Sequence, residues 1–194
     1  MRRPVVLYAC LLTVALAGSS RPPTWQAVTI PALSPASVPA PVAAPAPAAD
    51  PSPSRLLIPR IAVDAAIESR GLDPARNLAT PLDFNDVAWF NQGPAPGQPG
   101  TALINGHVDW WTGDAVFTRL AELRVGDPVI VVRADGTRSS FTVTGTRILA
   151  ATARDASLFA PGAAAKLTLI TCAGWWNPRL GSDSRRLLVT AALD

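Results

Sequence analysis

Short apolar runs alternate with turn-forming residues along the chain from Arg55 onward. Such runs, separated by Gly, Pro, Asn and Asp, are typical of antiparallel β structure. An Asp-Gly pair at 135–136 lies between two of the runs and predicts a hairpin. A single closed or nearly closed barrel is the simplest arrangement for these strands. The strands are predicted at residues 55–58, 63–67, 87–90, 101–105, 128–133, 140–149, 166–172 and 186–192.

One segment, residues 114–123, has helical spacing instead. Val116, Leu120 and Leu123 would line one side of a helix that begins at Asp114. We find no internal repeat and no dinucleotide-binding or phosphate-binding loop in the sequence. The pattern therefore predicts a mainly all-β domain with a single helical segment.

The region before the predicted strands has two parts. Residues 1–20 place Arg2 and Arg3 before an apolar run at 5–17, which is the layout of an export signal and is short for a membrane span. Cleavage as a signal peptide and retention as a membrane anchor both remain open. Residues 21–54 are rich in Pro and Ala, favour an extended polyproline conformation, and predict a disordered linker. We place the folded domain at residues 55–194.

Composition and charge narrow the class of protein. The chain has 194 residues, of which 48% are hydrophobic and 16% charged, which suits one modest domain with additional sequence. The net charge is +3, but residues 55–194 hold 14 basic and 13 acidic residues, and 14 − 13 leaves only +1. A nucleic-acid-binding protein needs a concentrated basic patch, and the sequence shows none, so we expect no nucleic-acid partner.

Cys172 is the first candidate for chemistry. The sequence has two cysteines, and removal of the export signal would take Cys10 with it. Cys172 would then stand alone in an exported protein, which excludes an intramolecular disulfide framework. An unpaired cysteine at the end of an apolar strand is either an inert packing residue or a nucleophile.

His107 is the only histidine of the chain, and it follows a predicted strand that ends at Asn105 and Gly106. An imidazole can take the proton of a thiol and later protonate a leaving amine. The oxyanion formed by thiolate attack on a carbonyl needs a fixed donor, such as an arginine. Arg185 and Arg186 open the last predicted strand and Arg179 precedes it, and spacing alone does not choose among the three.

Other site types fit the sequence poorly. One histidine and one cysteine do not make a zinc shell, and the acidic residues lack calcium-loop spacing. The sequence also has no nucleophile elbow of the GxSxG type. We therefore expect no metal and no organic cofactor.

Three motifs together resemble the sortase family. "TLITC" at 168–172 is similar to the sequence that ends in the sortase nucleophile, "NGHVD" at 105–109 to the histidine motif, and "RRLLVTA" at 185–191 to the last strand with its arginine. The resemblance covers about residues 54–194 and looks closest to class E and F sortases of actinobacteria. Three further stretches are also similar to the sortase pattern, at residues 96–109, 115–132 and 135–143.

The resemblance implies an eight-stranded sortase-type β-barrel with one or two short helices and a cysteine transpeptidase activity at the cell surface. Cys172 corresponds to the nucleophile and His107 to its acid/base partner. Arg185 matches the substrate-steadying and oxyanion-steadying arginine best, with Arg186 one place away. Asn105 and Thr171 are predicted to contact substrate, Thr171 by offering its hydroxyl to the substrate carbonyl.

Four tryptophans depart from the sortase pattern. They follow His107 and Cys172, and they either line a wall for the substrate peptide or cap one end of the barrel. These tryptophans are Trp110, Trp111, Trp175 and Trp176.

The partners that the resemblance implies are surface proteins with a C-terminal LPXTG-type sorting signal and an amine acceptor from peptidoglycan or a lipid-linked precursor. An uncleaved N-terminus would add the membrane. We expect an exported enzyme at the extracytoplasmic face of the membrane or in the cell wall. Two alternatives remain: a thiol hydrolase on the same scaffold, and a catalytically silent module that binds wall peptides or glycans.

Overall fold

The computed structural model describes residues 52–111 and 113–194. The predicted export signal lies outside these residues, as does the predicted linker up to residue 51. The first strand begins at Pro53, two residues before the first strand predicted from the sequence. No helix within the described residues is long and apolar enough to cross a membrane.

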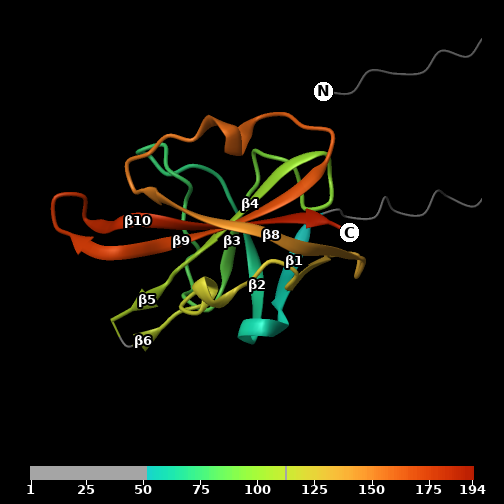
Figure 1. The fold of residues 1–194 in the computed structure, drawn as a ribbon, viewed down its shortest axis with the longest axis horizontal. Helices are drawn as coiled ribbons and strands as arrows, with labels where there is room; N and C mark the ends of the chain where they lie inside the picture. Colours follow the sequence, from blue (N-terminus) through green and yellow to red (C-terminus); the bar gives the residue numbers. More distant parts are fainter. Residues whose placement is uncertain (1–51, 112) are drawn as a thin grey trace, which may run out of the picture. The chain divides into compact units, whose positions relative to one another are not determined.

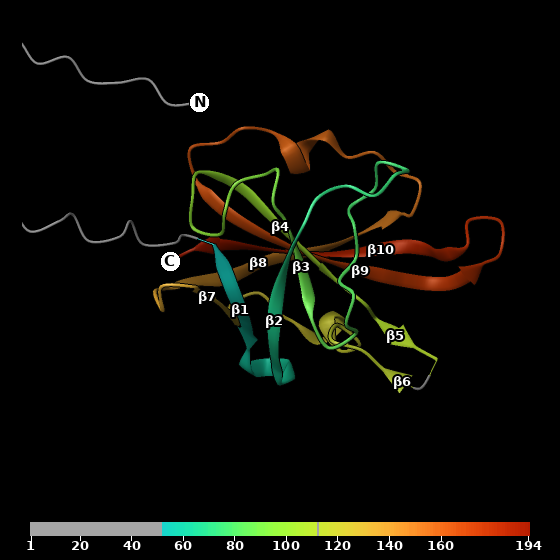
Figure 2. The ribbon, with the colours of Figure 1, turned by 180° about the vertical axis from the view of Figure 1, so that it is seen from behind.

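Eight strands close into a barrel in the order β1-β2-β3-β4-β9-β10-β8-β7 (Figures 1 and 2). A separate two-stranded sheet, β5 Asp109–Trp110 with β6 Gly113–Asp114, projects from it. All eight predicted strands are present. Their observed bounds are β1 Pro53–Ile58, β2 Val63–Arg70, β3 Val87–Phe90, β4 Gly100–Gly106, β7 Pro128–Arg133, β8 Arg138–Ala150, β9 Ala165–Asn177 and β10 Ser182–Leu193.

The barrel is not wholly antiparallel, which corrects the expectation from the sequence. β2 pairs with β3 in parallel, and β4 pairs with β9 in parallel. Parallel neighbours need a long connection, and residues 71–86 supply it between β2 and β3. The chain between β4 and β9 includes two further barrel strands. Both parallel pairs therefore follow from long crossovers that the hydrophobic pattern does not reveal.

The helix expected at residues 114–123 is wrong in type and extent, since only η2 Leu120–Glu122 is helical there and it is a 3-10 turn. Two other 3-10 turns are present, η1 Pro59–Ile61 and η3 Ala156–Phe159. The N–H of Val116 donates to Phe84 and that of Phe117 to His107, so these groups serve distant partners instead of a helix. The apolar positions are still buried, as Leu120 shows.

Successive side chains of a strand point to opposite faces of the sheet, and the apolar residues therefore form two clusters, one on each face. Leu167 and Leu169 of β9 point into the barrel and belong to the main core. Ile170 points outward, where it joins a smaller cluster with Leu188 of β10. The part of the outer wall around Ile170 and Leu188 is therefore apolar as well.

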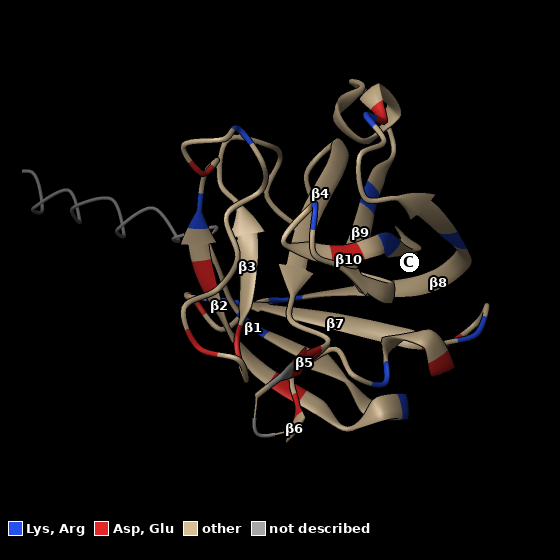
Figure 3. Cartoon of the chain, turned by 90° about the vertical axis from the view of Figure 1, so that its left-hand side faces the viewer, with Lys and Arg blue, Asp and Glu red and all other residues tan. Residues whose placement is uncertain are grey.

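Charges are interspersed over the described residues. Both Lys or Arg positions and Asp or Glu positions are present on the side of the barrel that Figure 3 presents. This distribution agrees with the nearly equal numbers of basic and acidic residues in 55–194.

We expect Gly106→Ala to lower the free energy of unfolding by about 1 to 3 kcal/mol, because overpacking a closed core strains it. A Cβ at Gly106 would lie 2.7 Å from Val116 Cγ1 and 2.8 Å from Phe117 Cδ2. Chemical denaturation would measure the change. Gly145→Ala is the matched control, because a Cβ there meets no atom within 4 Å. Equal stability of the two variants would contradict the packing described here.

Candidate active site

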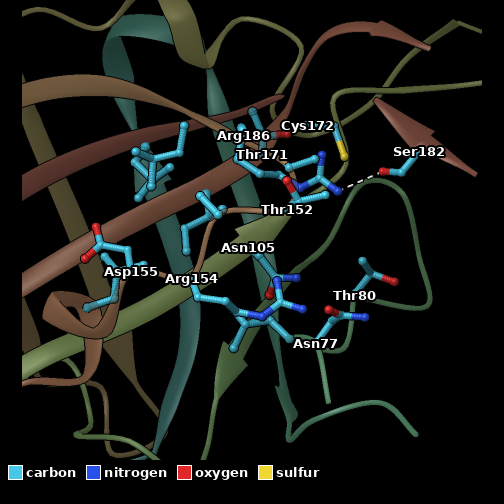
Figure 4. Close-up of a pocket in the computed structure, with 18 of the residues that line it drawn as sticks. Asn77, Thr80, Asn105, Thr152, Arg154, Asp155, Thr171, Cys172, Ser182 and Arg186 are labelled. Atoms are coloured by element: carbon cyan, nitrogen blue, oxygen red, sulfur yellow. Dashed lines mark hydrogen bonds between the residues drawn. The ribbon is translucent and has the colours of Figure 1, made fainter. Parts of the chain in front are cut away.

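Cys172 lies on β9 directly opposite Arg186 of β10. Side chains that oppose each other across two strands point to the same face of a sheet. The cysteine is free and partly buried, and its sulfur lies beside the Arg186 guanidinium (Figure 4). A cation therefore sits next to the only cysteine among the described residues.

Cys172, His107 and Arg186 line one cavity of about 640 Å³ on the outer wall of the barrel. One side of the cavity comes from the loop between β2 and β3, including Leu78, and another from the segment that follows β8. Apolar side chains from the outer cluster, among them Ile170, form part of the lining. The three groups named from the sequence thus share one space, with Arg186 in place of Arg185.

β4 brings His107 to the cavity. This strand runs parallel to β9 with Asn105 opposite Ile170, so the residues that follow both partners lie side by side. The Oγ1 of Thr171 donates to the carbonyl oxygen of Gly106 at 2.8 Å and fastens the two strands together. The expectation that Thr171 offers its hydroxyl to substrate meets a physical obstacle, because that proton is already donated inside the fold.

Asn105 also lines the cavity, where its Nδ2 donates to the carbonyl oxygen of Ala79 at 3.2 Å. This bond ties the end of β4 to the loop between β2 and β3. Asn105 therefore shapes the cavity wall, and contact with substrate remains a prediction.

Arg185 and Arg186 have different surroundings. Arg186 donates through Nη1 to the carbonyl oxygens of Asp183 at 2.9 Å and Arg185 at 2.8 Å, and through Nη2 to Ser182 Oγ at 2.8 Å (Figure 4). Arg185 is exposed, and its guanidinium lies 5.4 Å from the ring centre of Trp175. The geometry favours Arg186 over Arg185 as the arginine of the site, because of these two residues Arg186 alone lines the cavity.

The segment after Cys172 is a hairpin, not a loop. β9 continues to Asn177 and β10 begins at Ser182, and the hairpin projects from the same end of the barrel as β5 and β6 (Figures 1 and 2). Trp175 and Trp176 lie on it with 64% and 63% of their surface exposed, and Trp111 is 87% exposed. None of the described tryptophans lines the cavity, so a wall for the substrate peptide made by them stays a prediction. The side chain of Trp110 lies outside the described residues.

Burial raises the pKa of the Cys172 thiol above its ordinary value. The positive charge of Arg186 opposes this effect, while the negative charges of Asp183 and Asp109 add to it. The pKa of Asp183 is itself raised, first by burial and then by the charge of Asp109. A raised pKa favours the protonated thiol, so a reaction through sulfur needs a group that removes its proton.

A metal centre has no ligand set here. Within residues 52–111 and 113–194, no three His, Cys, Asp or Glu side chains gather closely enough to hold a metal ion. The chemistry that the arrangement does support is attack by sulfur, with imidazole as proton acceptor and guanidinium as the positive charge.

Sequence reasoning did not point to Ser182, Asp183 or the loop at 71–86 as parts of the site. Ser182 and Asp183 closely precede Arg186 in the sequence, and this nearness could have indicated that they lie at the site. The loop reaches the cavity by a crossover, and no local sequence feature marks it.

Comparisons with known proteins support one family. A family model for the sortase domain matches residues 56–194. The fold is similar to that of sortase C-1 from Actinomyces oris, at 26% identity over 73% of this chain and 73% of that chain, with a TM-score of 0.57. It is also similar to sortase A from Corynebacterium diphtheriae, at 23% identity over 75% of this chain and 61% of that chain, with a TM-score of 0.57.

A third structure, sortase C1 from Streptococcus agalactiae, matches at 20% identity over 73% of this chain and 66% of that chain, with a TM-score of 0.56. The two likenesses below 25% identity support the fold alone. A search of curated proteins gave no match. The predicted assignment to class E or F stays a prediction, since these three structures are sortases A and C.

We expect charge changes around Cys172 to move its pKa in opposite directions. In a Cys10→Ser background, Asp183→Asn removes a negative charge and lowers the thiol pKa, whereas Arg186→Gln removes a positive charge and raises it. The pH dependence of alkylation by iodoacetamide measures both shifts. Asp135→Asn, in the turn between β7 and β8, is the control, and it should leave the pH dependence of alkylation unchanged. Shifts of the same sign in the first two variants would contradict the electrostatics described.

Proposed function

The chain belongs to the sortase family, and on this basis we propose that it is a cysteine transpeptidase with Cys172 as nucleophile. The observation that carries the proposal is the shared cavity, in which thiol, imidazole and guanidinium come from three different strands or strand ends. Packing alone does not require these three groups to meet at a solvent-accessible wall. A free cysteine placed there has the surroundings of a nucleophile.

The first half of the reaction forms a thioester. His107 takes the proton of the Cys172 thiol, and the sulfur attacks the carbonyl carbon of the scissile peptide bond. The carbonyl oxygen becomes an oxyanion, which the Arg186 guanidinium stabilises. The C–N bond then breaks, and His107 returns its proton to the departing amine.

The second half transfers the acyl group. An incoming amine attacks the thioester carbon, His107 accepts a proton from that amine, and the sulfur leaves and regains its proton from His107. The product contains a new amide bond. Water in place of the amine would give hydrolysis instead.

We propose an LPXTG-type sorting signal as substrate, as the family resemblance implies. The apolar lining from Leu78, Ile170 and Leu188 suits the leucine and proline of such a signal. The acceptor would be an amine of peptidoglycan or of its lipid-linked precursor. This chemistry requires the extracytoplasmic side of the membrane, where clients and wall polymers meet.

Incubation of the chain with an LPXTG-type peptide should yield a thioester on Cys172, detected by mass spectrometry. Cys172→Ala should abolish the adduct and His107→Ala should prevent its formation, because each removes a group that the first step needs. Added amine should convert the adduct to an amide. Release of free acid despite added amine would indicate a hydrolase, and absence of any adduct would favour a silent binding module.

Arg186→Gln should lower kcat about 100-fold or more, the typical loss when one oxyanion donor is removed. Arg185→Gln is the matched control one residue away, and it should leave kcat near the wild-type value because Arg185 stacks on Trp175 outside the cavity. Steady-state kinetics with the same peptide measures both. The reverse ranking would return the role to Arg185.

A further inference from the structure

One peptide group next to the cavity has both of its polar atoms engaged. The N–H of Leu82 donates to Glu68 Oε1 at 2.7 Å. The carbonyl oxygen of Pro81, at the other end of the same peptide bond, lies 3.3 Å from His107 Nε2. A carboxylate and an imidazole thus contact opposite ends of the Pro81–Leu82 peptide.

The geometry of a peptide bond links these two contacts. The described residues contain no cis peptide bond, and a trans peptide is planar with its N–H and C=O pointing in opposite directions. Glu68 Oε1 accepts a second bond from the N–H of Asp83 at 3.2 Å, so the same carboxylate also holds the next peptide group, between Leu82 and Asp83. The direction of the Pro81 carbonyl therefore depends on the carboxylate of Glu68.

This carbonyl selects a tautomer of His107. A carbonyl oxygen only accepts hydrogen bonds, so Nε2 must carry the proton and the neutral ring has its lone pair on Nδ1. Phe84, from the same loop, packs against the imidazole with ring centres 5.0 Å apart. The loop thus sets both the position of the ring and the nitrogen that can accept a proton.

We propose that Glu68 is a positioning residue for His107, acting through the Pro81–Leu82 peptide group. In serine-protease triads a carboxylate contacts the histidine directly. Here a peptide group stands between the two, and its N–H and C=O bonds polarise each other. The consequence for catalysis rests on the proposed function of His107, whereas the consequence for the tautomer does not.

Glu68 is held for this task by its strand. It lies on β2 opposite Ala88 of β3, and its Oε2 is 3.9 Å from Arg70 Nη1. The loop that leaves β2 returns past Glu68 before it enters β3, which is how Leu82 and Asp83 reach the carboxylate. Glu68, near the end of β2, therefore holds a peptide group of the connection that leaves the same strand.

Nitrogen NMR of the full chain tests the tautomer directly, because His107 is the only histidine. With nitrogen-15-labelled histidine, at a pH where the ring is neutral, wild type should show the proton on Nε2. Glu68→Ala should shift the population toward the Nδ1–H form. Glu68→Gln should keep the wild-type form, since its amide oxygen accepts from the same two N–H groups.

Kinetics with the LPXTG-type peptide forms the second arm. We expect Glu68→Ala to lower kcat about 10-fold or more, as misplacement of a reacting group does, with little change in KM. Glu68→Gln should recover most of the loss. Asp64→Ala is the control on the same strand, where the carboxylate pairs with Arg55 at the surface. Circular dichroism checks that each variant is folded.

The outcomes separate the two proposals. An Nδ1–H form in wild type, or a wild-type tautomer pattern in folded Glu68→Ala, would overturn the role of Glu68 whatever the kinetics show. A loss of kcat in Glu68→Ala without a tautomer change would likewise overturn it. The expected tautomer shift in a chain that forms no thioester would support the positioning role and refute the proposed transpeptidase.

Discussion

The pairing of β9 with two different neighbours is the constraint on which the site depends. β4 runs parallel to β9 on one side and β10 runs antiparallel on the other. The first pairing places His107 near Cys172, and the second places Arg186 opposite it. The bond from Thr171 to Gly106 holds the parallel pair together at the point where the strands leave the barrel core. A slip of one residue in either register would reverse which side chains face the cavity.

The surroundings of Cys172 explain why a partner base is needed. Burial and two carboxylates raise the thiol pKa, and the Arg186 guanidinium and the Ser182 hydroxyl only partly offset them. A sulfur in this setting is protected from adventitious reaction while it is protonated. Its reactivity then depends on the imidazole, which is why the orientation of His107 matters as much as its presence.

Much of this arrangement could be predicted from the sequence, because strand positions follow from alternating apolar residues. Cys172 and His107 stood out by their rarity, and the motifs around them pointed to the family. The motif match favoured Arg185, whereas the structure brings Arg186 to the cavity. Adjacent residues on a strand face opposite sides, and only the observed register with β9 separates the two arginines. The helix expected at 114–123 does not form, because the N–H groups of Val116 and Phe117 bond to distant residues and those that follow close tighter local turns, which periodicity does not reveal.

The β2–β3 loop shows a deeper limit of sequence reasoning. The loop contributes backbone atoms to the site. The carbonyl oxygen of Ala79 accepts a hydrogen bond from Asn105, and that of Pro81 contacts Nε2 of His107. Every residue has a carbonyl, so no residue type marks the position. What can carry a signal is the side chain that orients the backbone, and here that side chain is Glu68, on a strand remote in sequence from His107. Residues that act through a peptide group are therefore found only when the fold shows which peptide plane they hold.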